Sequence, residues 1–179
     1  MEQKVLRAVM VCLLLMSMAI LGRETAAYVE TVNAVNALQG NNADTDGIPT
    51  VVIDAGHGGD DPGKIGINGA PEKDINLRIT EKLRQYLEAD GIRVVLTRET
   101  EDGLYDASAP NKKVQDMKRR IEKIEQTDPV LTVSIHQNKF TQSQYDGTQV
   151  FYSGNHEESR LLASAIRESV TGLLQPDNT

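Results

Sequence analysis

The sequence predicts an α/β fold with three layers, in which helices flank a largely parallel or mixed sheet. Short runs of apolar and β-branched residues at 51–53, 92–97 and 130–135 are typical of strands buried in such a sheet. Between these runs lie segments whose apolar residues recur at helical spacing. Strand and helix therefore alternate from residue 50 onward, which is the pattern of βαβ units.

Residues 1–27 have the pattern of an export signal. Lys4 and Arg7 give a positive start, an apolar region covers 8–21, and residues 25–27 are small, as a signal peptidase requires. The apolar region is shorter than the ~20 residues that cross a membrane comfortably. We interpret the segment as a cleaved signal peptide, with a retained N-terminal anchor as the alternative. We expect an exported protein that meets the membrane only through this segment.

The rest of the chain is acidic and contains no cysteine. Cys12 is the only cysteine among the 179 residues, so the exported part has no disulfide, thiolate metal ligand or cysteine nucleophile. The net charge of the chain is −7, and removing residues 1–27, which carry +1, leaves −8. An acidic chain with few aromatic residues is a poor candidate for binding nucleic acid.

Residues 28–49 are interpreted as a linker. Asn, Ala, Asp, Gly and Thr dominate this segment, and its apolar residues suggest only a weak helix. The folded domain is therefore expected over residues 50–179.

The first predicted strand leads into a glycine-rich loop that carries a histidine. Glycines within 56–63 allow sharp turns and positive φ angles after the strand. His57 stands in this loop, beyond the carboxyl end of a strand, where open α/β sheets build their sites. A helix is expected next, beginning near Pro71 and ending near Gly91.

A second helix is expected after the strand at 92–97. Its apolar face consists of Val114, Met117, Ile121 and Ile124. The helix is also rich in basic residues, which are Lys112, Lys113, Lys118, Arg119, Arg120 and Lys123. Asp116 and Arg120 carry opposite charges four residues apart, which favours a solvated helix face over a binding patch. Lys118 and Glu122 repeat this pattern.

His136 directly follows the third expected strand, 130–135, at its carboxyl end. A turn at residues 146–147, a strand over 148–152, an amphipathic helix and a final loop at 175–179 are expected after it. A chain that stops in a loop after such a helix leaves a sheet edge and apolar surface uncovered. We therefore expect the sheet to lack its C-terminal strands.

Two histidines that leave parallel strands at one edge of a sheet suit a metal ion. Neutral imidazole is the commonest nitrogen ligand of Zn²⁺, and a catalytic zinc has three protein ligands and one open position. Glu72 is the best-placed third ligand, since it follows the glycine loop and opens the first helix. An acid in the first helical turn also stabilises the helix dipole, so this role stays open. The competing carboxylates are Asp54, Asp60, Asp61 and Asp74.

The glycine-rich loop also allows a second chemistry, in which its backbone N–H groups bind a phosphate together with Mg²⁺. This alternative predicts oxygen ligands only and leaves His57 and His136 off the metal. The three aspartates of the loop and the missing Gly-Lys-Ser/Thr ending disfavour it. His156, beside two glutamates, is interpreted as a surface residue. Arg98 is either structural or faces the substrate.

Four motifs in order resemble one family of enzymes. They are the run at 51–63, Glu72-Lys73, Leu96-Thr97-Arg98 and Ser134-Ile135-His136-Gln137-Asn138. Together they resemble the zinc-dependent N-acetylmuramoyl-L-alanine amidases of bacterial cell walls, the amidase-3 family, over about residues 50–175. Within this family, segments 104–106 and 147–152 are most similar to the germination-specific amidases of spore formers.

The resemblance implies a metal, its ligands and a reaction. His57, Glu72 and His136 would bind Zn²⁺, and the domain at 50–179 would be the amidase catalytic domain. Its reaction would be hydrolysis of the amide bond between N-acetylmuramic acid and L-alanine in peptidoglycan, during spore cortex maturation or germination. An activating protein partner and a location on the cell-wall side of the membrane, or in the spore intermembrane space, are further expectations.

The general base of this family is a glutamate near the C-terminal end, which we expect beyond Thr179. No residue present is therefore assigned as the base. We interpret 50–179 as a C-terminally truncated catalytic domain. The alternative is a shortened protein, a non-catalytic module that binds zinc and peptidoglycan without hydrolysing it.

Overall fold

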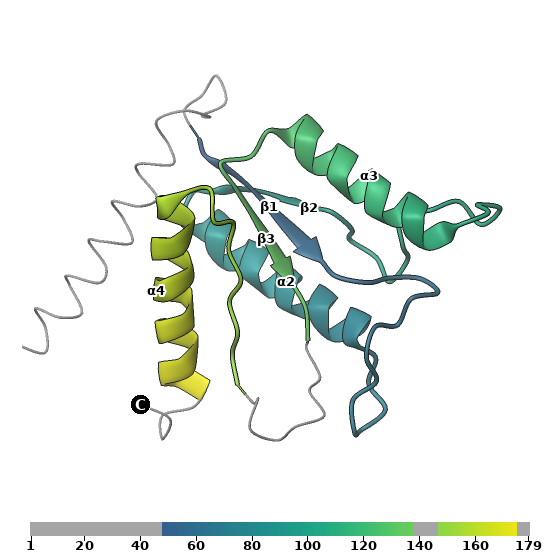
Figure 1. Ribbon diagram of the computed structural model, residues 1–179, viewed down its shortest axis with the longest axis horizontal. Helices are drawn as coiled ribbons and strands as arrows, with labels where there is room; N and C mark the ends of the chain where they lie inside the picture. The colour runs from purple at the N-terminus through teal and green to yellow at the C-terminus, as the bar shows by residue number, and fades with distance from the viewer. Residues whose placement is uncertain (1–47, 138–146, 175–179) are drawn as a thin grey trace, which may run out of the picture. The chain divides into compact units, whose positions relative to one another are not determined.

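The computed structural model describes residues 48–137 and 147–174, which belong to two separate units (Figure 1). The first unit contains, in order, β1 (Thr50–Ala55), α2 (Glu72–Ala89), β2 (Arg93–Leu96), α3 (Lys112–Thr127) and β3 (Leu131–Ile135). The second contains α4 (Glu157–Leu174). The expected signal segment, almost all of the linker and the C-terminal loop lie outside the described residues. No helix in the described part of the chain is long and apolar enough to cross a membrane.

Three parallel strands form the sheet of the first unit, in the order β2-β1-β3. In the register of this sheet, Val52 lies between Val95 of β2 and Thr132 of β3. The chain passes from β1 to β2 through α2 and returns across β1 to β3 through α3. Since such crossovers are right-handed, the two helices lie on opposite faces of the sheet (Figure 1). The predicted α/β class with its parallel sheet is therefore confirmed.

The order of the strands reverses at β1. The connection from β1 leads to β2 on one side of β1, whereas β3 pairs with the other side of β1. In an open α/β sheet, ligands bind outside the carboxyl ends of the strands where the strand order reverses in this way. The loop with His57 follows β1, and His136 follows β3, so both histidines lie at this point.

The two faces of β1 differ because successive side chains of a strand point to opposite sides. On the α2 face, Val51 and Ile53 form an apolar core with Leu96, and Leu83 and Leu87 of α2 pack against it. The α3 face is polar at the end of the strand. The carboxyl end of β1, which leads into the loop with His57, is thus packed against an apolar layer on one face and against charged side chains on the other.

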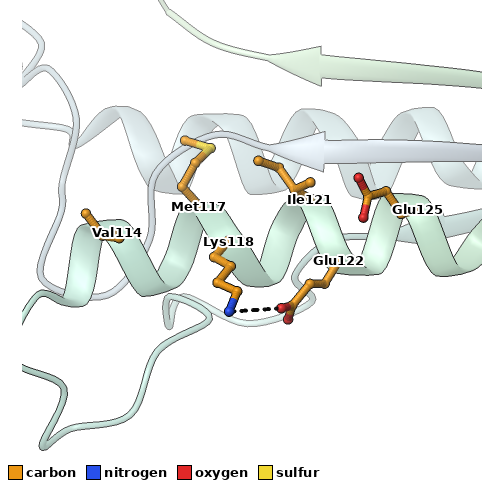
Figure 2. A pocket seen from close by; sticks show the side chains of 6 residues that line it. All are labelled: Val114, Met117, Lys118, Ile121, Glu122 and Glu125. Carbon is orange, nitrogen blue, oxygen red and sulfur yellow. Dashed lines mark ion pairs between the residues drawn. The ribbon is translucent and has the colours of Figure 1, made fainter.

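The prediction that the basic residues of α3 form a solvated face holds for Lys118, which pairs with Glu122 at 3.6 Å, but it is wrong for Arg120. Arg120 is only 3% exposed, and its guanidinium forms an ion pair of 2.6 Å with Asp54 of β1. Val114, Met117 and Ile121 are instead exposed (Figure 2). The physical reason is Asp54, whose carboxylate lies on the α3 face and requires a cation there. The helix therefore turns a charged residue toward the sheet.

The prediction of a strand over 148–152 is wrong. These residues form no regular secondary structure, and Phe151 and Tyr152 are exposed. A strand is stabilised by its hydrogen-bonded neighbour, and no strand within the described ranges pairs with this segment. The helix predicted after it is confirmed as α4, and His156 before it is an exposed residue, as predicted.

Candidate metal centre

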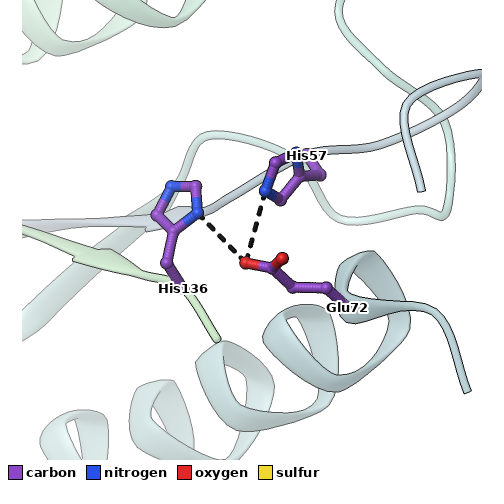
Figure 3. Close-up of side chains that lie close together, drawn as sticks. All are labelled: His57, Glu72 and His136. Carbon is purple, nitrogen blue, oxygen red and sulfur yellow. Dashed lines mark hydrogen bonds and ion pairs between the residues drawn. The ribbon is translucent and has the colours of Figure 1, made fainter. Parts of the chain in front are cut away.

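Three potential metal ligands from three elements meet at the carboxyl edge of the sheet. They form the His/Glu/His cluster, which consists of His57 from the loop after β1, Glu72 at the start of α2 and His136 after β3 (Figure 3). His57 Nε2 and His136 Nδ1 each lie 3.2 Å from Glu72 Oε1. One ligand atom from each residue lies within 4.8 Å of the other two. The structure thus brings together the three residues that the sequence singled out.

The close approach of these side chains depends on glycines in the loop. A β-carbon at position 56 would overlap the imidazole of His136. At Gly63, where φ is +67°, a β-carbon would lie 2.7 Å from Glu72 Oε2 and from His57 Cδ2. His57 itself has a φ of +64°, a left-handed conformation that non-glycine residues rarely adopt. The backbone is therefore bent where the ligands must converge.

Glu72 is held as a carboxylate by hydrogen bonds from the main chain. It is 3% exposed, and its two oxygens accept bonds of 2.8 Å from the backbone N–H groups of Lys64 and Gln137. Burial raises the pKa of Glu72, but these bonds and the neighbouring His57 lower it further than burial raises it. The net pKa lies below its ordinary value, so Glu72 is ionised at neutral pH.

Asp61 binds the far side of the His57 ring. Its Oδ2 lies 3.0 Å from His57 Nδ1, and in the tautomer that donates this hydrogen bond, Nε2 presents a lone pair toward Glu72. A lone pair and a carboxylate oxygen 3.2 Å apart repel each other unless a proton or a metal ion lies between them. A carboxylate on the second nitrogen of a metal-binding histidine is also the usual outer partner of such a ligand. The cluster therefore fits a divalent cation.

The donor set indicates which cation fits. Two imidazole nitrogens and one carboxylate are the ligands of hydrolytic zinc sites that keep a fourth position open. The oxygen-only set required for Mg²⁺ is not what converges here, which disfavours the phosphate-handling alternative.

The other candidate carboxylates lie outside the cluster. Asp54 accepts hydrogen bonds from Thr97 and Ser134 on the α3 side of the sheet. Asp60 pairs with Lys112 at 2.6 Å. Asp61 is hydrogen-bonded to His57 Nδ1. Asp74 is not part of the His/Glu/His cluster.

Two buried arginines hold the glycine-rich loop through hydrogen bonds to its main-chain carbonyls. The sequence left the role of Arg98 open between two alternatives and did not reveal that of Arg120. Arg98, which the sequence left as structural or substrate-facing, is 2% exposed and donates to main-chain carbonyls, so it is structural. Arg120 donates to the carbonyl oxygens of Ala55 and His57, at 2.7 and 2.6 Å. Nothing in the local pattern around Arg120 distinguished it from its solvated neighbours.

The chain belongs to the N-acetylmuramoyl-L-alanine amidase family Amidase_3, which it matches over residues 51–179. It is 31% identical to the germination-specific N-acetylmuramoyl-L-alanine amidase of Bacillus subtilis over 123 residues, which is 67% of this chain and 52% of that protein. It is 36% identical to the amidase AmiA of Escherichia coli over 120 residues, 66% of this chain and 37% of that protein. The chain thus spans about half or less of these relatives.

Among solved structures, the fold is similar to the CwlD amidase of Clostridioides difficile, determined in complex with the GerS lipoprotein. The TM-score is 0.68 and the identity 39%, over 73% of this chain and 69% of that one. A second match is the catalytic domain of CwlV from Bacillus (Paenibacillus) polymyxa var. colistinus, with a TM-score of 0.53 and 32% identity over 65% of this chain and 59% of that one. The predicted family is confirmed.

Proposed function

We propose that this protein is a zinc-dependent amidase that hydrolyses the bond between N-acetylmuramic acid and L-alanine in peptidoglycan. The observation that carries the proposal is the convergence of His57, Glu72 and His136, with ligand atoms within 4.8 Å of one another. This convergence occurs in a chain that belongs to a family of N-acetylmuramoyl-L-alanine amidases. Neither the family membership nor the cluster alone supports the proposal as strongly as the two together.

The His/Glu/His cluster and the neighbouring Asp61 would together hold the metal and leave one side open to the substrate. Glu72 supplies the buried negative charge, and Asp61 orients the His57 ring. When bound, Zn²⁺ supplies a Lewis acid that polarises the scissile carbonyl and lowers the pKa of a water molecule. The His136 side chain is 45% exposed and that of Glu72 only 3%, so we infer that the substrate approaches on the His136 side.

The general base is not assigned among the described residues. Within 48–137 and 147–174, Glu72 is the only carboxylate in the cluster, and Asp61 is occupied by His57 and by the backbone N–H of Gly63. We infer that a glutamate outside the described residues supplies the base, as the family resemblance implies. The second candidate function is a module that binds zinc and peptidoglycan without hydrolysis.

We infer a role in spore germination and an exported location from the sequence. The similarity to a germination-specific amidase and to CwlD supports the first. The pattern of residues 1–27 supports the second. The GerS complex of CwlD supports a protein partner for this chain as well.

Metal analysis of purified variants tests the site. His57→Ala and His136→Ala are expected to abolish stoichiometric zinc binding, because each removes one of three ligands. His156→Ala is the matched control, since it removes an exposed histidine outside the cluster, and it should bind as wild type does. Unchanged stoichiometry in both cluster variants would refute the zinc site.

Incubation of the zinc-loaded protein with purified muropeptides separates the two functions. Release of stem peptide, detected by mass spectrometry and absent in His136→Ala, supports the amidase. Binding of muropeptides without release supports the non-catalytic module.

A further inference from the structure

Arg98 connects the segments that carry two of the proposed zinc ligands. It lies two residues after β2, and its side chain is 2% exposed. In the described part of the chain, all four of its hydrogen bonds end on main-chain carbonyl oxygens. These belong to Ala55 at 2.9 Å, Gly56 at 3.1 Å, Lys73 at 2.7 Å and Thr100 at 2.8 Å.

A single nitrogen of Arg98 joins the neighbours of both ligands. Nη2 donates to the carbonyl of Gly56, which precedes His57, and to that of Lys73, which follows Glu72. The Gly56 carbonyl also accepts a bond of 3.2 Å from Asn76, a fully buried residue of α2. The peptide before His57 is thus fixed to the first turns of the helix that begins with Glu72.

We propose that Arg98 is a positioning residue of the metal centre, which sets the separation between His57 and Glu72 without touching metal or substrate. This inference rests on the proposed zinc site. The planar guanidinium is required because its donors point in fixed, divergent directions toward three segments of the chain. A lysine ammonium retains the charge but concentrates its donors on one atom, and it cannot bridge these segments in the same way.

The location of Arg98 excludes a direct role in binding the substrate. Its guanidinium is buried beneath the loop, and four of its five N–H donors bind carbonyl groups. Burial and the nearby charge of Arg120 lower the pKa of Arg98. Burying this cation is unfavourable. Its presence is consistent with a need for the hydrogen bonds that the guanidinium donates, which an apolar side chain cannot form.

The test compares Arg98→Lys with Arg84→Lys in the full chain. Arg84 is the matched control because its only described partner is the surface residue Glu99, at 3.2 Å. Zinc affinity is measured by competition with a chromophoric chelator, and ligand geometry by the visible absorption spectrum of the Co²⁺-loaded protein. Circular dichroism of the metal-free protein reports folding. We expect Arg98→Lys to lower zinc affinity about 10- to 100-fold, as loss of an outer partner of a metal site does, and to change the Co²⁺ spectrum. Arg84→Lys should change neither.

Three outcomes would overturn the positioning role. The first is a folded Arg98→Lys protein with the zinc affinity and Co²⁺ spectrum of wild type. The second is failure of both Arg98→Lys and Arg98→Gln to fold at saturating zinc, since Arg98 would then be a requirement of the fold itself. The third is absence of zinc binding by wild type and Arg84→Lys alike, which would refute the proposed function as well and is thereby distinguishable from the first two.

Discussion

The ring of His136 lies against the backbone of Gly56, in the space where a β-carbon would otherwise stand. Gly56→Ala is therefore expected to displace this ligand and to lower zinc affinity about 10- to 100-fold. Gly154→Ala is the control, because a β-carbon there meets open space. Competition with a chromophoric chelator measures the zinc affinity of both variants. Equal affinities would show that the His136 ring accommodates the methyl group by a shift that leaves the metal site intact.

Single residues were predictable where chain position alone decides their role. His57 and His136 follow strands of a parallel sheet, and this fact predicted that they share an edge. Glu72 had four competitors by spacing alone, and the family resemblance was needed to select it. The role of Arg120 could not be predicted, because it depends on Asp54, a residue distant in sequence whose carboxylate points to the same side of the sheet.

At the scale of elements, the charged contact between α3 and β1 is expected to dominate the stability of this packing. Arg120→Leu leaves Asp54 and Asp116 without their shared cation and leaves the carbonyls of Ala55 and His57 with one donor fewer. Removing one partner of a buried pair costs about 3–5 kcal/mol, so we expect a loss of that order in the free energy of unfolding. Urea unfolding followed by circular dichroism measures it.

Arg119→Leu is the matched control for this experiment. Arg119 is the adjacent residue and pairs with Asp106 at the surface. Surface pairs contribute little to stability, so this variant should unfold nearly as wild type does. If the two variants were equally stable, the Arg120 pairing would not hold the helix to the sheet.

The same contact predicts how stability depends on pH. Burial raises the pKa of Asp54, but hydrogen bonds from Ser134 and Thr97 and the charge of Arg120 together lower it below its ordinary value of 3.8. A carboxyl group whose pKa is lower in the folded state stabilises the fold above its unfolded pKa and loses this effect as the pH falls. We expect the metal-free protein to lose stability below about pH 4, and Asp54→Asn to show a weaker dependence there. Identical pH profiles would contradict this assignment.

Most elements could be predicted from periodicity, and their exceptions have a common cause. The strands of the sheet and the helices at 72–89, 112–127 and 157–174 agree with the sequence pattern. The strand over 148–152 does not form, and the outward apolar face of α3 was not foreseen. The fate of residues 148–152 and the orientation of α3 both depend on which part of the protein packs against the segment. The pattern of side chains along one segment does not contain that information.

For the molecule as a whole, a metal bound by three elements should stabilise the fold. Zinc that binds only the folded state adds about 2.7 kcal/mol to the free energy of unfolding at 100 times its dissociation constant. We expect the midpoint of thermal unfolding to rise with zinc concentration and to fall on addition of a chelator. A His57→Ala/His136→Ala protein should show neither effect. Wild type with a midpoint independent of zinc would contradict binding at this site.

The pairing of Ala55 with Ile135 across β1 and β3 also determines when the metal can bind during folding. A slip of one residue between these strands would turn His136 to the opposite side of the sheet. The ion therefore has no site until two distant parts of the chain have aligned correctly, and contacts between such parts form slowly. Zinc binding by a refolding chain would therefore report when β1 and β3 reach their native register. We expect it to occur later than the recovery of the helical circular dichroism signal.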